Sequence, residues 1–269
     1  MIVRLLRSAQ WHDAAPGDVS VEDRGLLLGD GVFETFVVTD GDIRHGAQHA
    51  ARLKAACAAL EIAFPDWTRV AEEAARLALP GRHVGRLTVT RGPGPRGLAP
   101  IANAVATIWL SLSPAAQPPR ALALAVSRYK RSPSSLSAQH KTLSYADNAA
   151  ARREAVAAGA DMALMLTTGG HVSGGDCANI FAVSGSRLWT PSAECAIRCG
   201  VMRERVLALA GAQGLSVEEG RFALGDFEQA DALFVTNSAL GLVPVSRLGA
   251  RAFSADHAIV GALRLAEAR

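Results

Sequence analysis

The sequence predicts an α+β (α/β) protein made of two sub-domains. Strand-like and helix-like hydrophobic patterns are mixed along 269 residues, a length sufficient for one large domain or two packed ones. Residues 113–119 combine prolines with small residues, which is typical of a domain junction. We therefore predict an N-terminal α/β domain over 1–112, a linker over 113–120 and a larger C-terminal domain over 121–269.

The first half of the chain contains both kinds of pattern. Residues 32–38 alternate and are rich in β-branched and aromatic side chains, and 39–42 have turn chemistry, which predicts a hairpin. Apolar residues at helical spacing predict two helices, and a loop rich in Gly and Pro separates two further strands. The predicted helices are 45–60 and 67–79, the strands are 86–90 and 105–112, and the loop is 91–97.

The second half is predicted to mix buried strands with three helices. Gly159 is placed to end one helix, and Gly185 with Ser186 forms a tight turn between two strands. The predicted strands are 121–127, 161–167, 179–183, 187–190 and 231–236, and the predicted helices are 145–158, 201–212 and 254–268.

Composition excludes several classes of protein. The net charge of +3 comes from scattered basic residues, so we expect no nucleic-acid partner. The first residues lack a signal-peptide pattern, and no window has the roughly 18 apolar residues of a membrane helix, so the cytoplasm is the expected location and no membrane partner is expected. His45 and His49 are four residues apart, but the cysteines and histidines complete no zinc motif, and we expect no metal.

Lysine is scarce in this chain, which draws attention to Lys141. Of 28 basic residues only Lys54, Lys130 and Lys141 are lysines. A lysine amine forms a Schiff base with an aldehyde, whereas a guanidinium does not. A GC-rich genome is the alternative explanation for the scarcity. Lys141 lies in a polar stretch that leads into a predicted helix, and it is the candidate catalytic amine.

Three further features are suited to a phosphate. Gly200 precedes a predicted helix, so the free backbone N–H groups of Val201 and Met202 favour an anion. The Thr236-Asn237-Ser238 segment follows a predicted strand and offers hydroxyl and backbone donors. Arg52, on the first predicted helix, offers a bidentate guanidinium. Alone, a glycine before a helix is an ordinary cap and a helical arginine is ordinarily solvated. With Lys141, the set points to pyridoxal 5'-phosphate.

The sequence resembles class IV, fold type IV pyridoxal-phosphate enzymes. This family includes branched-chain and D-amino-acid aminotransferases and 4-amino-4-deoxychorismate lyase. The matching motifs keep their order and spacing nearly end to end: DRGLLLGDGVFE (23–34), HAARL (49–53), TRGPGPRG (90–97), KTLSY (141–145), ANIF (178–181), TP (190–191), GVMR (200–203) and TNS (236–238).

The resemblance implies a fold and a set of roles. It implies two α/β domains with the cofactor at their interface, and a homodimer. Lys141 is implied as the Schiff-base lysine and proton shuttle, and Tyr145 as a neighbour of the cofactor's phenolic oxygen. The other implied cofactor-binding residues are Arg52, Gly174, Asn179, Gly200, Val201, Met202, Thr236, Asn237 and Ser238.

The chain departs from the family at Gly174. The family normally has a glutamate five residues before the asparagine of the Asn-Ile-Phe motif, where it keeps the pyridine nitrogen protonated. Counting back from Asn179 reaches Gly174 instead. Asp176 is the nearest carboxylate, but in extended backbone it lies about 6.5 Å further along. We expect Asp176 to be an ordinary loop acid in preference to a substitute.

Two reactions of the family stay open, and the sequence favours one. A transaminase depends on a strong electron sink in the cofactor ring. In aminodeoxychorismate lyase, a step of folate biosynthesis, formation of aromatic 4-aminobenzoate with release of pyruvate supplies driving force. The missing glutamate, the short chain and the loop arginines Arg91 and Arg96, which can bind a substrate carboxylate, favour the lyase. An amino-acid aminotransferase is the alternative, and a degenerate, non-enzymatic paralogue is the distant one.

Overall fold

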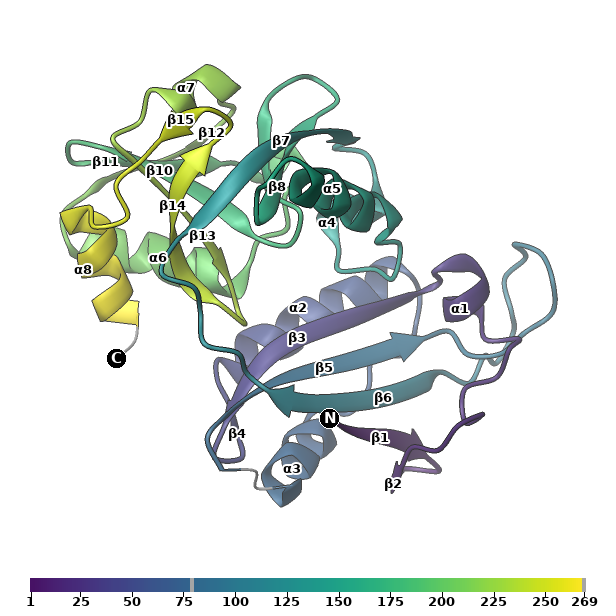
Figure 1. Ribbon diagram of the computed structural model, residues 1–269. Helices are drawn as coiled ribbons and strands as arrows, with labels where there is room; N and C mark the ends of the chain where they lie inside the picture. The colour runs from purple at the N-terminus through teal and green to yellow at the C-terminus, as the bar shows by residue number, and fades with distance from the viewer. Residues whose placement is uncertain (78–79, 268–269) are drawn as a thin grey trace. The chain divides into compact units, whose positions relative to one another are not determined.

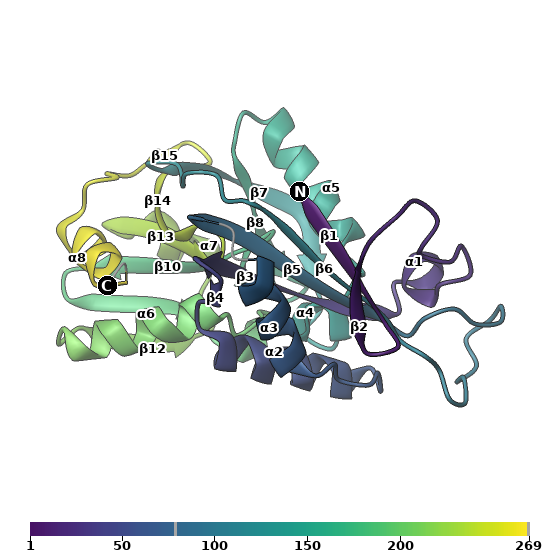
Figure 2. The same ribbon diagram turned by 90° about the horizontal axis from the view of Figure 1, so that it is seen from below.

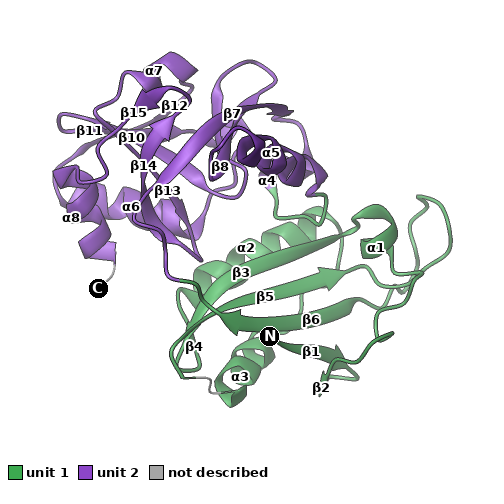
Figure 3. Cartoon of the chain, viewed as in Figure 1, with its two compact units in different colours: residues 1–116, 140–144 green, residues 117–139, 145–269 purple. Residues whose placement is uncertain are grey.

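The chain folds into two compact units. The computed structural model describes residues 1–77 and 80–267. Unit 1 contains residues 1–116 and 140–144, and unit 2 contains residues 117–139 and 145–269 (Figure 3). The short segment 140–144 therefore packs with unit 1, although the chain on both sides of it belongs to unit 2.

Unit 1 is built on a six-stranded antiparallel sheet (Figure 1). The strand order is β2-β1-β6-β5-β3-β4, and β5 pairs along its whole length with β3 and from His83 to Thr90 with β6. The strands are β1 (Ile2–Arg7), β2 (Gln10–Asp13), β3 (Gly31–Thr39), β4 (Asp42–Ile43), β5 (Arg82–Thr90) and β6 (Thr107–Pro114).

Two helices cover this sheet and complete its core. They are α2 (Gly46–Ala59) and α3 (Trp67–Leu77), which lie against the sheet in Figure 2, and a short helix α1 (Arg24–Leu28) precedes β3. Leu53 of α2 and Val70 of α3 are fully buried against the strand residues Phe36 and Leu87. The apolar stripe of each helix therefore faces the strands, as its sequence spacing predicts.

Residues 141–143 are held to the first residues of β3 by backbone hydrogen bonds. The Phe33 N–H donates to the Lys141 carbonyl at 2.8 Å, and the Leu143 N–H donates to the Gly31 carbonyl at 2.9 Å. Val32 and Thr142 form an antiparallel bridge. This pairing fixes the backbone of Lys141 within unit 1.

Unit 2 contains a mixed nine-stranded sheet. The order is β12-β11-β10-β13-β14-β7-β8-β9, with β15 on β14, and β7 runs parallel to both β14 and β8. The strands are β7 (Leu122–Arg131), β8 (Met162–Thr167), β9 (Val172–Gly175), β10 (Asn179–Ser184), β11 (Arg187–Pro191), β12 (Ser216–Gly220), β13 (Ala232–Asn237), β14 (Gly241–Leu248) and β15 (Arg251–Ala252).

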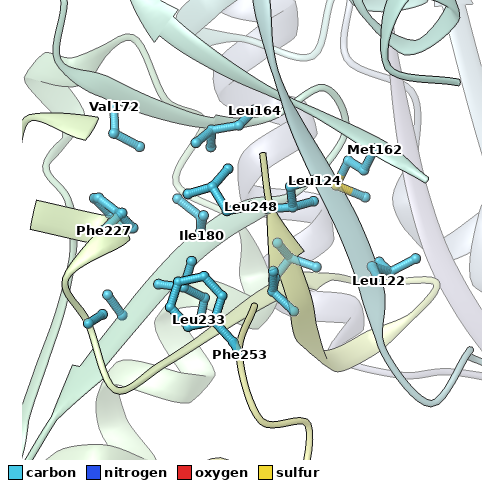
Figure 4. Close-up of a cluster of buried hydrophobic side chains, with 14 of the residues drawn as sticks. Leu122, Leu124, Met162, Leu164, Val172, Ile180, Phe227, Leu233, Leu248 and Phe253 are labelled. Carbon is cyan, nitrogen blue, oxygen red and sulfur yellow. The ribbon is translucent and has the colours of Figure 1, made fainter. Parts of the chain in front are cut away.

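Alternation along the central strands divides the core of unit 2 into clusters. Ile180 joins one cluster, shown in Figure 4, while Phe181 joins another and stacks on Phe234 at 4.9 Å between ring centroids. This period of two is that of a strand buried on both faces. The helices are α4 (Leu136–Gln139), α5 (Ala146–Ala157), α6 (Val201–Ala212), α7 (Leu224–Glu228) and α8 (Ala258–Glu267), with a 3-10 turn at Ala193–Cys195.

The predicted fold class and most long elements are confirmed, with shifted ends. The predicted helix 201–212 matches α6, but β6 begins at Thr107 and continues to Pro114, and β7 extends to Arg131. Residues 254–257 lie outside α8, because Ser254 Oγ accepts from the Asp256 N–H in a turn. The predicted ends at 78–79 and 268 lie outside the described residues. Among residues 1–77 and 80–267 no helix is long and apolar enough to cross a membrane.

Leu53→Ala tests the core of unit 1. The side chain is fully buried, so its truncation should lower the free energy of unfolding by about 2–5 kcal/mol. Leu98, which is 83% exposed in the same unit, provides the matched control, and Leu98→Ala should stay within about 0.5 kcal/mol of the parent. Urea denaturation of both variants gives the comparison. Equal losses would contradict the assignment of Leu53 to the core.

Candidate cofactor-binding site

In unit 1, Lys141 lies beside an aromatic ring. Its Nζ is 4.0 Å from the ring centroid of Phe33, the β3 residue whose N–H also bonds the lysine carbonyl. The guanidinium of Arg86, on β5, lies 3.6 Å from the same centroid. The ring attracts the amine by cation–π interaction, and the backbone bond fixes the main chain beneath it. The lysine is half-buried.

Arg52 is oriented by a buried carboxylate that the sequence analysis missed. Its Nε lies 3.1 Å from Glu34 Oε2, and its Nη2 donates to Glu34 Oε1. His49 Nδ1, one helical turn earlier on α2, lies 2.7 Å from the same Glu34 oxygen. Glu34 and His49 are both buried. Arg52 thus binds Glu34 through Nε and Nη2, and its Nη1 is the guanidinium nitrogen that does not bind Glu34.

Glu34 stays ionised despite its burial. Burial alone would raise the pKa of this carboxyl, but hydrogen bonding from His49 and the charge and hydrogen bonds of Arg52 outweigh it and lower the pKa. A charged residue at a buried position of β3, with His and Arg three residues apart on the covering helix, is the sequence signal that would have identified this group.

The two loop arginines lie in different environments. Arg91 binds both oxygens of Asp30, at 2.7 and 3.1 Å, and also donates to the carbonyls of Glu61 and Leu60. Its guanidinium is therefore committed to fixing the loop. Arg96 is exposed at the tip of the same loop.

In unit 2, the N-terminus of α6 meets the start of β10. Gly200 is the N-cap of α6 and makes no side-chain cap bond, so the first-turn amides of Val201 and Met202 have no partner within the helix. A Cβ at Gly200 would lie 2.4 Å from Asn179 Oδ1. The Asn179 side chain in turn donates to the Arg198 carbonyl at 2.9 Å. An alanine at position 200 would have to displace the Asn179 side chain.

Thr236, on β13, lies next to Asn179 across the sheet. It pairs with Asn179 in the β10–β13 register. Its Oγ1 is buried and has no hydrogen-bond partner among residues 1–77 and 80–267. The Asn237 side chain accepts from the Leu240 N–H at 2.7 Å and donates to the Cys177 carbonyl at 3.3 Å, so it shapes the turn that contains Ser238. The orphaned hydroxyl calls for an acceptor from outside the protein.

Tyr145 and Arg198 are neighbours in unit 2. The guanidinium of Arg198 donates to the Tyr145 hydroxyl, and its Cζ lies 4.8 Å from the ring centroid. Tyr145 forms the N-cap of α5, whereas Arg198 precedes α6 by three residues. The sequence analysis did not single out Arg198, because nothing local marks it.

Gly174 lies on β9, opposite Met165 of β8. Asp176, the nearest acid, is buried and committed elsewhere. Its two oxygens bind Arg152 at 2.7 and 2.6 Å, and one of them also accepts from the Ala163 N–H at 2.8 Å. Asp176 is therefore a structural anchor for α5 and β8, and its side chain does not replace a glutamate at 174.

The comparisons with known proteins identify the family. The sequence model of the family described as Amino-transferase class IV matches residues 31–248. The chain belongs to this family. Class IV aminotransferases use pyridoxal phosphate, so the cofactor prediction is confirmed, and a solved aminotransferase from Mycobacterium tuberculosis with the same fold (TM-score 0.85, 22% identity, 98% of this chain and 96% of that one) is a PLP-bound form.

Similar proteins include both lyases and aminotransferases. An aminodeoxychorismate lyase of Vibrio harveyi is 32% identical, with 89% of this chain and 91% of that protein covered. A putative branched-chain-amino-acid aminotransferase of Methanocaldococcus jannaschii is 33% identical, with 93% and 89% covered. The crystal structure of 4-amino-4-deoxychorismate lyase from Pseudomonas aeruginosa has a TM-score of 0.85, 31% identity and 95% of each chain covered.

The residues of unit 2 fit the phosphate of this cofactor. The first-turn amides of α6, which have no partner within the helix, and the orphaned Thr236 hydroxyl are the donors that suit a phosphate. Lys141 carries an amine, a group that can form a Schiff base with an aldehyde.

Glu34→Gln tests the buried carboxylate. The pKa of Glu34 is lower in the folded than in the unfolded protein. The ionised carboxylate therefore makes its full contribution to the stability of unit 1 at pH values above its unfolded pKa of about 4.3. This contribution is lost as the pH falls through the lower, folded pKa. The free energy of unfolding of the variant should be about 3–5 kcal/mol lower than that of the parent at neutral pH, and this difference should become smaller in acid. Unfolding free energies against pH measure it, with exposed Glu22→Gln as control. A pH-independent gap would contradict this account.

Gly200→Ala tests the proposed phosphate-binding site at the N-terminus of α6. The new Cβ would displace Asn179 Oδ1 and should weaken pyridoxal-phosphate binding about tenfold or more, equivalent to about 1.4 kcal/mol. Gly211→Ala, in the same helix with open space around it, should leave affinity unchanged and increase stability by about 0.5–1 kcal/mol. Titration of apoprotein with cofactor gives both affinities. Equal affinities would show that the α6 N-terminus does not bind the phosphate.

Proposed function

We propose that this protein is a pyridoxal-phosphate-dependent lyase that converts 4-amino-4-deoxychorismate into 4-aminobenzoate and pyruvate. The observation that carries the proposal is the absence of a carboxylate at position 174, with Asp176 committed to Arg152. Full-length similarity to aminodeoxychorismate lyases supports it.

The chemistry explains why this observation favours a lyase. Pyridoxal phosphate, when bound, supplies an aldehyde for the substrate amine and a ring that withdraws electrons from the adjacent carbon. Transamination requires strong withdrawal, which a carboxylate at 174 would support by keeping the ring nitrogen protonated. In the lyase reaction, loss of the proton from the amine-bearing ring carbon and departure of the enolpyruvyl group create an aromatic ring. Aromatisation therefore compensates for weaker withdrawal.

The proposed roles follow from the groups in each unit. Lys141 would hold the cofactor through its aldehyde, and its amine would be the base that takes the proton from the amine-bearing carbon of the substrate. The cofactor phosphate would be bound by the N–H groups of Val201 and Met202, by Thr236 and the 237–238 turn, and by Arg52. Tyr145, with Arg198, would interact with the phenolic oxygen. For the substrate carboxylate we propose Arg96, with Arg91 holding its loop in place.

An amino-acid aminotransferase is the second candidate. The 33% identity to a putative branched-chain aminotransferase supports it as strongly as identity alone supports the lyase. A homodimer, a cytoplasmic location and a place in folate biosynthesis are further parts of the proposal, and they rest on the resemblance and on composition.

Lys141→Arg tests the proposed amine. Arginine retains the charge beside Phe33 but forms no Schiff base, so borohydride reduction of the cofactor-loaded protein should attach cofactor to the parent and none to the variant. Lys54→Arg, an exposed lysine of unit 1, is the control and should retain full labelling. Peptide mass spectrometry locates the label, and labelling of the arginine variant would reject Lys141 as the amine.

Product assays separate the two reactions. The parent should release 4-aminobenzoate and pyruvate in equal amounts from 4-amino-4-deoxychorismate, and Lys141→Arg should lose at least about a thousandfold in rate, because the proton-transfer group is lost together with the cofactor link. Alanine, glutamate and branched-chain amino acids, each offered with a 2-oxo acid, test the alternative. Clear transamination without lyase turnover would overturn the lyase proposal.

A further inference from the structure

Arg131 is the charged side chain next to the position where Gly174 lacks a side chain. A Cβ built on Gly174 would lie 3.7 Å from Arg131 Nη1 and 2.9 Å from the Ala178 carbonyl oxygen. The second distance is too short for a real side chain, so the loop after β9 is built around a glycine. The space beside it contains a guanidinium in place of a carboxylate.

Within unit 2, Gly174 is connected through short contacts to the proposed phosphate-binding site at the N-terminus of α6. Ala178, whose carbonyl faces Gly174, directly precedes Asn179, whose Oδ1 occupies the space in front of Gly200. Ser173, on the other side of Gly174, donates to the Ala196 carbonyl at 3.0 Å in the segment that leads into α6. Gly174 and the N-terminus of α6 therefore flank one short stretch of backbone at the start of β10.

Arg131 is held by neutral oxygens. Nη1 donates to Ser173 Oγ at 3.3 Å, and Nη2 donates to the Gly175 and Asp176 carbonyls at 2.9 and 3.3 Å. Within the described part of the chain it forms no ion pair with a carboxylate. A guanidinium has five N–H donors and no acceptor, so donors remain for a further partner.

The surroundings disfavour additional positive charge. Burial, and then the neighbouring charge of Arg198, lower the pKa of Arg131 to about 10, so the side chain still carries its proton at neutral pH. A protonated pyridine nitrogen facing this group would place two donors and two positive charges against each other. An unprotonated nitrogen would accept a hydrogen bond instead.

We propose that Arg131 takes the place of the missing glutamate and donates a hydrogen bond to the ring nitrogen of bound pyridoxal phosphate, which keeps that nitrogen unprotonated. The ring is then a weaker electron sink, which suits an elimination driven by aromatisation and slows transamination. This consequence rests on the proposed function, whereas the protonation state of the nitrogen does not.

The competing interpretation is that Arg131 only braces the loop after β9 through its three hydrogen bonds. The two interpretations differ in a measurable quantity, the pKa of the ring nitrogen. A bracing residue would leave it unchanged. A facing guanidinium lowers it, because a nearby like charge disfavours the charged form.

The test is a pH titration of the ring nitrogen by nitrogen-15 NMR. Holoprotein loaded with cofactor labelled at that nitrogen is compared with Arg131→Gln and Arg131→Lys. The wild-type nitrogen should carry no proton at neutral pH, Arg131→Lys should behave similarly, and Arg131→Gln should raise its pKa by about one to three units. Arg128→Gln, an exposed arginine of β7 that pairs with Glu154, controls for the loss of one charge and should change nothing.

Two results would overturn the proposal. One is a protonated cofactor ring nitrogen in the wild-type holoprotein at neutral pH. This measurement needs no variant, so it does not depend on whether a variant folds. The other is an identical pKa in Arg131→Gln and Arg128→Gln, with both proteins shown to be folded by circular dichroism. An unprotonated nitrogen without 4-aminobenzoate release would overturn the lyase proposal alone, and a protonated nitrogen with lyase turnover would overturn the Arg131 proposal alone.

Discussion

The backbone pairing between residues 141–143 and the start of β3 is the constraint on which the position of Lys141, the proposed reactive amine, depends. Lys141 lies between α4 and α5, which belong to unit 2, yet its main chain bonds Phe33 and Gly31 of unit 1. The same strand then supplies the Phe33 ring beside the amine and, at the next residue, the carboxylate that binds Arg52. One strand thus positions two groups that lie far apart in the sequence.

Unit 2 contributes residues whose arrangement depends on two glycines that other atoms approach closely. At Gly174 and Gly200 a Cβ would lie too close to the Ala178 carbonyl and to Asn179 Oδ1, respectively. The first-turn amides of α6 and the orphaned Thr236 hydroxyl lie near Gly200, and Arg131 lies near Gly174. An anion suits the first site. At the second, a group that accepts a hydrogen bond and carries no positive charge is favoured.

The sequence allowed local features to be predicted and left long-range partners hidden. The helix after Gly200 and the alternation in β10 are set by neighbouring residues, so periodicity finds them. The lysine was identifiable from its rarity and its motif. Arg131 lies 43 positions before Gly174, and nothing in the intervening sequence specifies that β7 extends to bring its last residue beside β9. The same holds for Asp176, whose burial against Arg152 depends on where α5 packs.

The most direct test of the account follows the cofactor through many turnovers. With 4-amino-4-deoxychorismate as substrate, the number of 4-aminobenzoate molecules released per cofactor converted to its amine form measures how the reaction divides between elimination and transamination. A site with a weak electron sink predicts many releases for each conversion, with pyruvate equal to 4-aminobenzoate. One conversion for each substrate consumed would contradict the claim that this site is built for elimination.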